Sequence, residues 1–256
     1  ILLVAFPVAH GTILTALYLP VALMLTGLIL RGVAFEFRAK APLPYKRPWD
    51  AAFFVGSLMA ALAQGFMLGM YIMGLSYSWV HVGFAVVTAV FLAVSYSFIG
   101  AAWLILKTDG TLQLRAIRWA RGGIWGLVLG LGAVSLATPL VSQRIFERWF
   151  SWPEMLWLAP LPILSIALVA LLARVLARLP LPDDRLARVP FVAASALMCL
   201  GFAGMAYSFY PYIVPERLTI DEAAAAPESL GIILIGVAIV LPVILAYTVL
   251  AYVIFR

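Results

Sequence analysis

Seven long apolar runs determine what this chain can fold into. They cover residues 10–33, 52–75, 79–106, 118–141, 155–178, 188–211 and 229–254. A helix needs about 20 apolar residues to cross the hydrocarbon core of a bilayer, and each run is long enough. The alternation of apolar and polar residues that marks membrane barrels is absent from the sequence. The runs predict an all-α polytopic membrane protein of helical bundles, with residues 1–256 forming a single multi-pass transmembrane domain.

Composition agrees with the membrane and excludes two other classes of protein. Only 11% of the residues are charged, against about 25% in soluble domains. The single cysteine, Cys199, rules out an internal disulfide and a cysteine-based metal cluster. A net charge of +6 would suggest nucleic acid in a soluble protein, but membrane orientation explains it here, so we expect no nucleic-acid partner. Residues 1–6, before Pro7, resemble the end of a helix, and we expect the chain to be part of a longer protein.

The basic residues between the runs predict the orientation. On one side we count 14 lysines and arginines: Arg31, Arg38, Lys40, Lys46, Arg47, Lys107, Arg115, Arg118, Arg121, Arg174, Arg178, Arg185, Arg188 and Arg256. The other side has 3, which are Arg144, Arg148 and Arg217. Because cytoplasmic loops carry the excess of basic residues, the first side and the C-terminus are predicted to be cytoplasmic. The longest outer loop, residues 212–228, is acidic, and its Asp221-Glu222 pair is placed to begin a short surface helix.

Glu36 is the first candidate for chemistry. It lies in LPVALMLTGLILRGVAFEFR, residues 19–38, where an apolar run meets Arg31 and Arg38. A charge in hydrocarbon costs about 2.5–3.5 kcal/mol, so Glu36 is expected at the boundary or facing protein or water. Two readings stay open. The carboxylate belongs to a proton path, or it pairs with Arg31, Arg38 or Lys40 as an ordinary interfacial acid.

Asp50 and Gln64 are further candidates, each with a structural alternative. Asp50 follows Trp49 at the start of the second run, where an aspartate caps the first backbone N–H groups of a helix. The cap is the favoured reading, and the proton path is the other. Gln64 lies inside the same run, and a buried amide needs a partner. A hydrogen bond to a neighbouring helix is favoured over contact with a quinone carbonyl.

His10 and His81 are the only histidines. Two helices that each offer one histidine can hold a haem, but isolated histidines at the outer ends of spans are favoured as interfacial residues facing water or headgroups.

Two glycine pairs and several absences suggest a subunit that packs against a partner. Gly65-x-x-x-Gly69 and Gly126-x-x-x-Gly130 allow helices to approach closely. The sequence has no Walker motif, no HExxH and no CxxC. No charged residue is expected at the middle of the membrane, where a transporter usually has a polar site.

Three stretches together resemble subunit II of the cytochrome bd quinol oxidases. They are residues 19–38, RPWDAAFFVGSLMAALAQGFMLG at 47–69, and FYPYIVPERLTIDEAAAAPESL at 209–230 followed by LPVILAYTVLAYVIFR. The YPYIVP and AAAPESL wording is closer to the cyanide-insensitive branch. The resemblance implies nine spans, as two four-helix bundles and a peripheral helix, so that the first helix and most of the second would lie upstream of this chain.

The resemblance also implies a function. We expect subunit II of a bd-type quinol:oxygen oxidoreductase of the respiratory chain, an electron-transport complex in the bacterial inner membrane. Haems b and d belong to the partner, subunit I, and this chain has no catalytic residue or metal ligand. Some family members hold a structural quinone or supply a cytoplasmic proton route, which implicates Glu36 and Asp50, with Arg31 and Arg38 as supporting charges and Gln64 as a quinone contact. The family often has an aspartate where this chain has Glu36. Membrane lipid, quinol and oxygen are the other expected partners, and a solute transporter or permease is the alternative.

Overall fold

The computed structural model describes residues 2–141, 143–181 and 186–254. Seven helices in this part of the chain are long and apolar enough to cross a membrane. Their bounds are α2 (Pro7–Lys40), α3 (Lys46–Ile72), α4 (Trp79–Lys107), α5 (Gly110–Val141), α8 (Pro160–Arg178), α9 (Val189–Phe209) and α11 (Pro227–Ile254). The predicted all-α membrane fold is confirmed. Of the basic residues counted for orientation, Arg185 and Arg256 lie outside the described residues.

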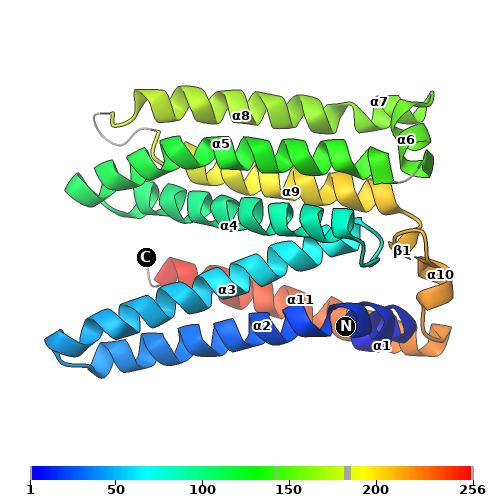
Figure 1. The fold of residues 1–256 in the computed structure, drawn as a ribbon, viewed down its shortest axis with the longest axis horizontal. Coiled ribbons are helices and arrows are strands. Elements are labelled where there is room, and N and C mark those ends of the chain that lie inside the picture. The colour runs from blue at the N-terminus through cyan, green and yellow to red at the C-terminus, as the bar shows by residue number, and fades with distance from the viewer. Residues whose placement is uncertain (1, 142, 182–185, 255–256) are drawn as a thin grey trace. The chain divides into compact units, whose positions relative to one another are not determined.

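Short elements connect the long helices (Figure 1). They are α1 (Leu2–Ala5), the 3₁₀ turn η1 (Leu43–Tyr45), α6 (Gln143–Phe150), α7 (Glu154–Leu158), β1 (Tyr212–Val214), β2 (Leu218–Thr219) and α10 (Ile220–Ala223). Four predicted spans differ clearly in their limits: the run 52–75 belongs to a helix that begins at Lys46, the run 118–141 belongs to a helix that begins at Gly110, and the other two are 155–178 and 10–33. The run 155–178 is divided between α7 and α8, because Pro160 begins a new helix. The run 10–33 is part of a longer helix that continues to Lys40.

The chain divides into two compact units, and the boundary between them falls inside α2. One unit is Ile1–Ala16 with Pro211–Arg256, and the other is Leu17–Tyr210. Leu17 leaves the helical region, at φ −114° and ψ 19°, three residues before Pro20. The proline ring disturbs the preceding turn and removes a hydrogen-bond donor, which accounts for the break. The expectation of a single transmembrane domain stays a prediction.

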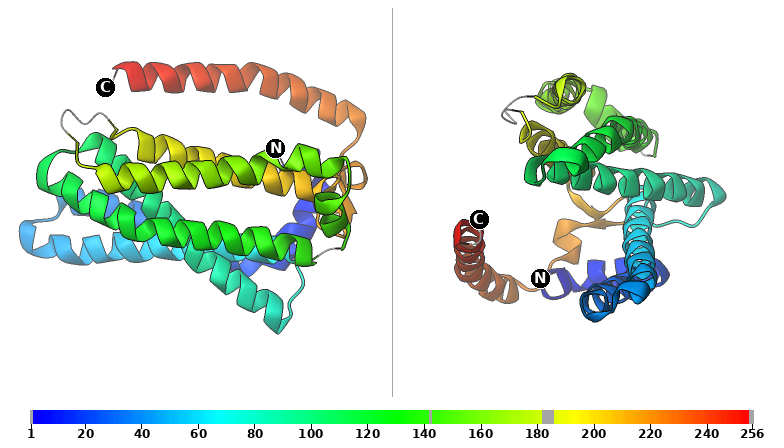
Figure 2. Two further views of the ribbon diagram at one scale, coloured as in Figure 1. Left: turned by 90° about the horizontal axis from the view of Figure 1, so that it is seen from above. Right: turned by 90° about the vertical axis from the view of Figure 1, so that its left-hand side faces the viewer.

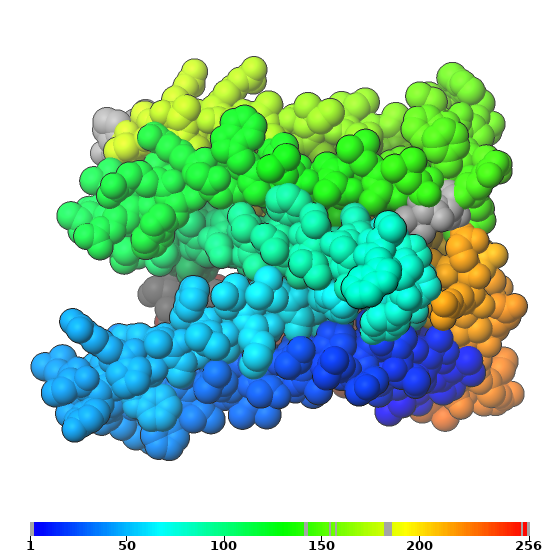
Figure 3. Space-filling model, viewed as in Figure 1, coloured from blue at the N-terminus to red at the C-terminus, as the bar shows by residue number. Residues whose placement is uncertain are grey.

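Four helices of the larger unit, α4, α5, α8 and α9, form a bundle around one apolar core. Figure 2 shows them side by side, and their side chains form a continuous surface over α4, α5 and α8 in Figure 3. The largest fully buried side chains of this core are Phe98, Ile105, Leu127, Leu172, Leu176 and Leu197. Each helix contributes at least one of them, so the bundle is held by interlocking large side chains.

The crossings of α2 on α3 and of α3 on α4 depend instead on glycine, whose lack of a side chain lets two helix backbones approach closely. A Cβ atom on Gly65 would lie 2.5 Å from the Cα of Ala89, and one on Gly69 would lie 2.5 Å from the Cα of Ala85. A Cβ on Gly56 would lie 2.6 Å from the carbonyl oxygen of Gly27. The predicted close approach at Gly65-x-x-x-Gly69 is therefore confirmed, and Gly27 with Gly56 forms a second contact of this kind.

The smaller unit contains a short hairpin followed by a short helix. Strands β1 and β2 pair antiparallel, and α10 follows with a capping box between Thr219 and Glu222. The predicted short helix at Asp221-Glu222 is thus confirmed, whereas the hairpin was not foreseen. The Thr219 backbone N–H and hydroxyl group, both bonded to Glu222, hold the pKa of its carboxyl group below the usual value. The backbone N–H of Ala225 donates to the carbonyl of Ala5 over 2.8 Å, which ties α1 to this segment.

Candidate functional site at the ion-pair end of α2 and α3

Glu36 lies in the last turns of α2, where the helix has left its apolar run. Its Oε1 accepts a hydrogen bond from Lys40 Nζ over 2.6 Å, an i,i+4 pair on one helix face. The Glu36 side chain is 62% exposed and that of Lys40 is 75% exposed. The interfacial pairing foreseen as one of the two readings therefore exists, with Lys40 as the partner. Water reaches the carboxylate, and its role in a proton path stays a prediction.

The prediction that Asp50 caps α3 was wrong. The helix begins at Lys46, after Tyr45, which places Asp50 in its second turn. Pro48 falls in the first turn, where no backbone N–H donor is needed, so the helix can begin before it. The Asp50 side chain is instead free to reach α2, and its Oδ1 accepts a hydrogen bond from Arg38 Nε. This ion pair joins the two helices at their exposed end.

The two arginines named as supporting charges have different neighbours. Arg38 is the partner of Asp50. The Arg31 guanidinium lies over the Phe53 ring, with 5.4 Å between Cζ and the ring centroid. At the same end of the two helices, the Phe37 and Trp49 rings stack with their centroids 5.1 Å apart and their planes at 23°. We call Glu36, Arg38, Lys40 and Asp50 the ion-pair end.

Gln64 and Ser57 lie two turns apart on α3, and Ser57 was not among the predicted site residues. Among the described residues the Gln64 amide makes no hydrogen bond, so the favoured bond to a neighbouring helix is not present there, and the quinone contact stays a prediction. The hydroxyl group of Ser57 is buried and has no hydrogen-bond partner among the described residues. The seven-residue spacing of Asp50, Ser57 and Gln64 would have indicated one helix face.

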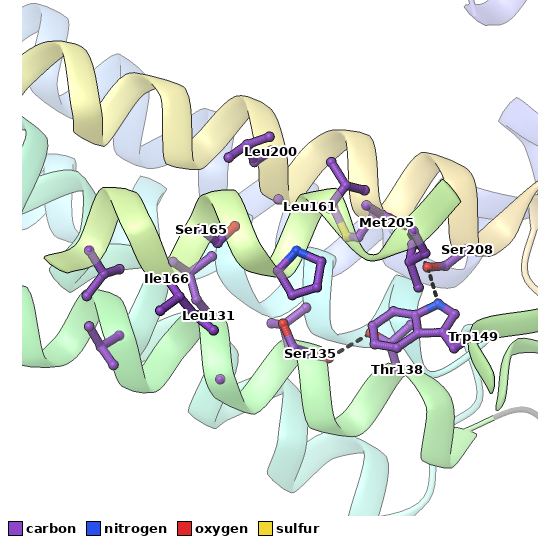
Figure 4. Close-up of a pocket in the computed structure, with 18 residues that line it drawn as sticks. Leu131, Ser135, Thr138, Trp149, Leu161, Ser165, Ile166, Leu200, Met205 and Ser208 are labelled. Carbon is purple, nitrogen blue, oxygen red and sulfur yellow. Dashed lines mark hydrogen bonds between the residues drawn. The ribbon is translucent and has the colours of Figure 1, made fainter. Parts of the chain in front are cut away.

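A cavity of about 570 Å³ lies between α5, α8 and α9 (Figure 4). Its walls are mostly apolar, with Leu131, Leu161, Ile166 and Met205 among them. Gln64 lines neither this cavity nor a second one of about 220 Å³ between α3, α4, α5 and α9. The first cavity has the size and character of a site for an apolar ligand.

Trp149, Thr138 and Ser208 lie together at one end of the larger cavity (Figure 4). Trp149 Nε1 donates to Ser208 Oγ over 2.9 Å, and that hydroxyl donates to the Gly204 carbonyl over 2.7 Å. Thr138 Oγ1 donates to the Val134 carbonyl of its own helix. Small hydroxyl residues inside apolar runs give little sequence signal, because they also occur as helix contacts.

The ring of His81 contacts a residue close to it in the sequence. His81 Nδ1 lies 2.5 Å from Ser76 Oγ and 3.0 Å from the Ser76 carbonyl oxygen. His10 lies in the smaller unit. Within the described ranges, no group of three or more His, Cys, Asp and Glu side chains could hold a metal ion. That this chain carries no haem ligands stays a prediction.

Comparisons with known proteins agree on one family. The model of the family described as "Cytochrome bd terminal oxidase subunit II" matches residues 1–255. The chain is 26% identical to "Cytochrome bd ubiquinol oxidase subunit 2" of Bacillus subtilis, over 98% of this chain and 76% of the relative. It is 25% identical to "Cytochrome bd-I ubiquinol oxidase subunit 2" of Escherichia coli K12, with the same coverage. It is also 25% identical to "Probable cytochrome oxidase subunit 2" of Haemophilus influenzae, over 97% of this chain and 75% of the relative. Since the family model spans the chain from end to end, this protein belongs to the cytochrome bd terminal oxidase subunit II family.

Proposed function

We propose that this chain is the haem-free subunit of an oxygen-reducing quinol oxidase, assembled with subunit I in a bacterial inner membrane. The match of the family model over residues 1–255 carries the proposal, and it favours an oxidase over the transporter that the sequence left as an alternative. In the assembled complex the haems b and d of subunit I supply the redox chemistry. The resemblance of residues 209–230 to the cyanide-insensitive branch of the family supports membership of that branch.

Contact with subunit I is supported by the apolar surface that the long helices leave uncovered. In the most apolar stretch of each span, at most 28% of the residues are buried. A helix that is apolar on all sides needs lipid or protein around it. Large exposed side chains on α2 and α3, such as Leu25, Ile29 and Phe54, are available for a partner helix.

We propose that the ion-pair end faces the cytoplasm, as the distribution of basic residues predicts. A cysteine at Ala41, after α2, should be protected from a membrane-impermeant thiol reagent in intact cells, and one at Ala224, beside α10, should be labelled after outer-membrane permeabilisation. Cys199 is exposed, so both variants should be made in a Cys199→Ser background. Labelling at Ala41 and protection at Ala224 would reverse the orientation.

At that end, Glu36 collects protons for oxygen reduction and passes them inward. The reaction consumes protons, and a site buried in the membrane needs a polar route from the surface. Glu36 is supported in this role by its exposure to water and by its surroundings, where between positions 31 and 50 five basic residues outnumber the two acids, Glu36 and Asp50.

The larger cavity is the proposed place of a structural quinone. An isoprenoid tail matches the apolar walls, and the hydroxyl groups of Ser135, Thr138 and Ser165 line the same space. This assignment replaces Gln64 as the preferred quinone contact, because Gln64 lies on no wall of the cavity.

One preparation tests the central proposal. The complex should be purified through a tag on this chain, and its haem absorbance and quinol oxidase turnover measured for the wild type and for Glu36→Gln. We expect haem to co-purify with the wild-type chain. We expect Glu36→Gln to keep the haem content and to lower turnover several-fold, most strongly at high pH. The reduction should stay below the roughly 10²–10⁴-fold scale of general acid–base catalysis, because water can bypass a surface donor.

Lys40→Met is the matched control, because it removes the ion pair and keeps the carboxylate. If the pair is only structural, it contributes about 0–1 kcal/mol, and the two variants should behave alike. Equal turnover of Glu36→Gln and wild type at all pH values would end the proton-entry role. A chain that is monodisperse alone and purifies without haem would contradict the assignment to the oxidase complex.

A further inference from the structure

A groove between α5 and α8 combines an apolar floor with a fixed positive charge. It has a volume of about 390 Å³ and is lined by Arg121, Ile124 and Trp125 from α5 and by Ala173, Leu176 and Ala177 from α8. The two helices run side by side (Figures 1 and 2). The small side chains of Ala173 and Ala177 leave the space open. None of these residues lines the two apolar cavities or belongs to the ion-pair end.

Arg121 is held in place by the end of α8. Its Nε donates to the Leu176 carbonyl over 2.8 Å, and its Nη2 donates to the carbonyls of Leu179, over 2.7 Å, and Ala177, over 3.4 Å. The last carbonyls of a helix lack partners within the helix, and Pro180, four residues after Leu176, has no N–H to offer. These bonds use one edge of the guanidinium. Among the described residues Nη1 makes no hydrogen bond, so its two N–H donors stay available.

The surroundings of the groove fit the headgroup level of a membrane. Trp125 stands beside Arg121 with 70% of its surface exposed, and tryptophan is enriched at the membrane–water interface. Arg118, one helical turn before Arg121, adds a second exposed cation on the same side of α5. Arg115, Arg174 and Arg178 increase the positive charge of these helix ends without lining the groove.

We propose that this groove binds one anionic phospholipid, from the leaflet that faces the basic side of the protein. The lipid phosphate accepts hydrogen bonds from Arg121 Nη1, and an acyl chain lies between α5 and α8 over Ala173 and Ala177. Charge complementarity selects this occupant, since basic pockets between membrane helices bind anionic headgroups. An apolar protein helix would leave the Arg121 donors unpaired, which carries a desolvation cost.

The test is a lipid titration of the purified, delipidated oxidase complex, followed by native mass spectrometry. The probes are dioleoylphosphatidylglycerol, dioleoylphosphatidylcholine and inorganic phosphate. We expect one phosphatidylglycerol to bind about tenfold more tightly than phosphatidylcholine, since each basic residue near a headgroup strengthens binding several-fold. Excess inorganic phosphate should not displace it, because the acyl chain contributes to binding.

Three variants separate this groove from general surface charge. Arg121→Gln removes the fixed cation and Ala173→Leu fills the floor, and each should weaken phosphatidylglycerol binding about tenfold. Ala173→Leu keeps the Arg121 bonds to α8, so its result does not depend on whether Arg121→Gln folds. Arg47→Gln, which removes an exposed charge from the η1–α3 segment, should change binding by less than about twofold.

Three results would overturn the proposal. Wild-type affinity in Ala173→Leu would show that the groove is not occupied. An equal loss in Arg47→Gln and Arg121→Gln would show that only diffuse surface charge attracts the lipid. Equal affinity for the two lipids, or displacement by phosphate, would exclude an anionic phospholipid as the specific ligand. The measurement counts bound lipid rather than turnover, so it is independent of the proton role of Glu36.

Discussion

The α3–α4 crossing and the bundle of α4, α5, α8 and α9 pack membrane helices in opposite ways. At the crossing, Gly65 and Gly69 allow the two backbones to approach. In the bundle, Leu172 and Leu176 are among the large side chains that fill the space between helices, and the α5 glycines Gly126 and Gly130 face side chains of α4, those of Val94 and Phe91, rather than its backbone. Helix α4 takes part in both. The comparison shows that one membrane helix can meet a neighbouring backbone on one face and pack large side chains on another.

Arginine is also used in two different ways. At the ion-pair end, Arg38 contacts the carboxylate of Asp50, and both side chains are about half exposed. Next to the bundle, Arg148 of α6 donates to the backbone carbonyls of Tyr207 and Tyr210 at the end of α9, and within the bundle Arg121 does the same for α8. The first use leaves both charged side chains in contact with water. The second completes helix ends.

Among the substitutions that test this comparison, Gly65→Val is expected to have the largest effect. The new Cβ would meet the Ala89 Cα at 2.5 Å, and backbone atoms cannot yield as a flexible side chain does. We expect little assembled complex, measured as haem-containing protein per cell. Gly122→Val is the control, because a Cβ there meets nothing within 4 Å. Normal yield of the Gly65 variant would mean that the crossing does not depend on close approach.

Arg148→Met should have a smaller effect than Gly65→Val. It should still destabilise the complex more than Arg38→Met does. Losing hydrogen bonds from a charged group to the α9 carbonyls should cost about 1.5–3 kcal/mol, and the contacts of Arg148 with the rings of Tyr207 and Tyr210 would be lost too. Breaking the exposed Arg38–Asp50 pair should cost about 0–1 kcal/mol. Thermal stability of the purified complex measures both. Equal destabilisation would remove the distinction between the two uses of arginine.

Glu222→Gln is expected to have the smallest effect, confined to α10. Glu222 accepts a hydrogen bond from the Thr219 backbone N–H over 2.9 Å, and its pKa is lowered by that bond. A lowered folded-state pKa means that the carboxylate stabilises α10 above its unfolded-state pKa, and that this contribution is lost as pH falls through the folded-state value. Amide hydrogen exchange at residues 219–223 should therefore speed up on acidification in the wild type, beyond the change in intrinsic exchange rate.

Asp221→Asn provides the matched control for that acid-dependent change. The neighbouring carboxylate takes no part in the capping box, so its removal should leave the change in place, whereas Glu222→Gln should abolish it. Retention of the change in Glu222→Gln would assign it to another group and leave the capping box without a measurable role.

The sequence predicted the helices better than the side-chain contacts, for physical reasons. Apolar runs of membrane length specify helices almost alone, because a lipid-exposed backbone must satisfy its own hydrogen bonds. We expected α3 to begin after Asp50, but it begins at Lys46, because Pro48 can occupy the first turn of a helix. Asp50 therefore lies inside the helix and forms an ion pair with α2 instead of a cap. The anchoring of Arg121 on α8 joins residues 55 positions apart, which no local pattern reveals. The cavity walls likewise come from five helices, α5 to α9.

Helix α11 has a consequence for how the protein is made. Its mean hydropathy of 2.8 is the highest of the seven spans, and its 28 residues contain one charged group, Glu228, in the first turn. At 1.5 Å per residue the helix is roughly 42 Å long, more than the hydrocarbon thickness, and it can span with some tilt. Such a segment partitions into the bilayer on its own free energy as it leaves the translocon. Membrane insertion of α11 therefore needs no neighbouring helix to be in place.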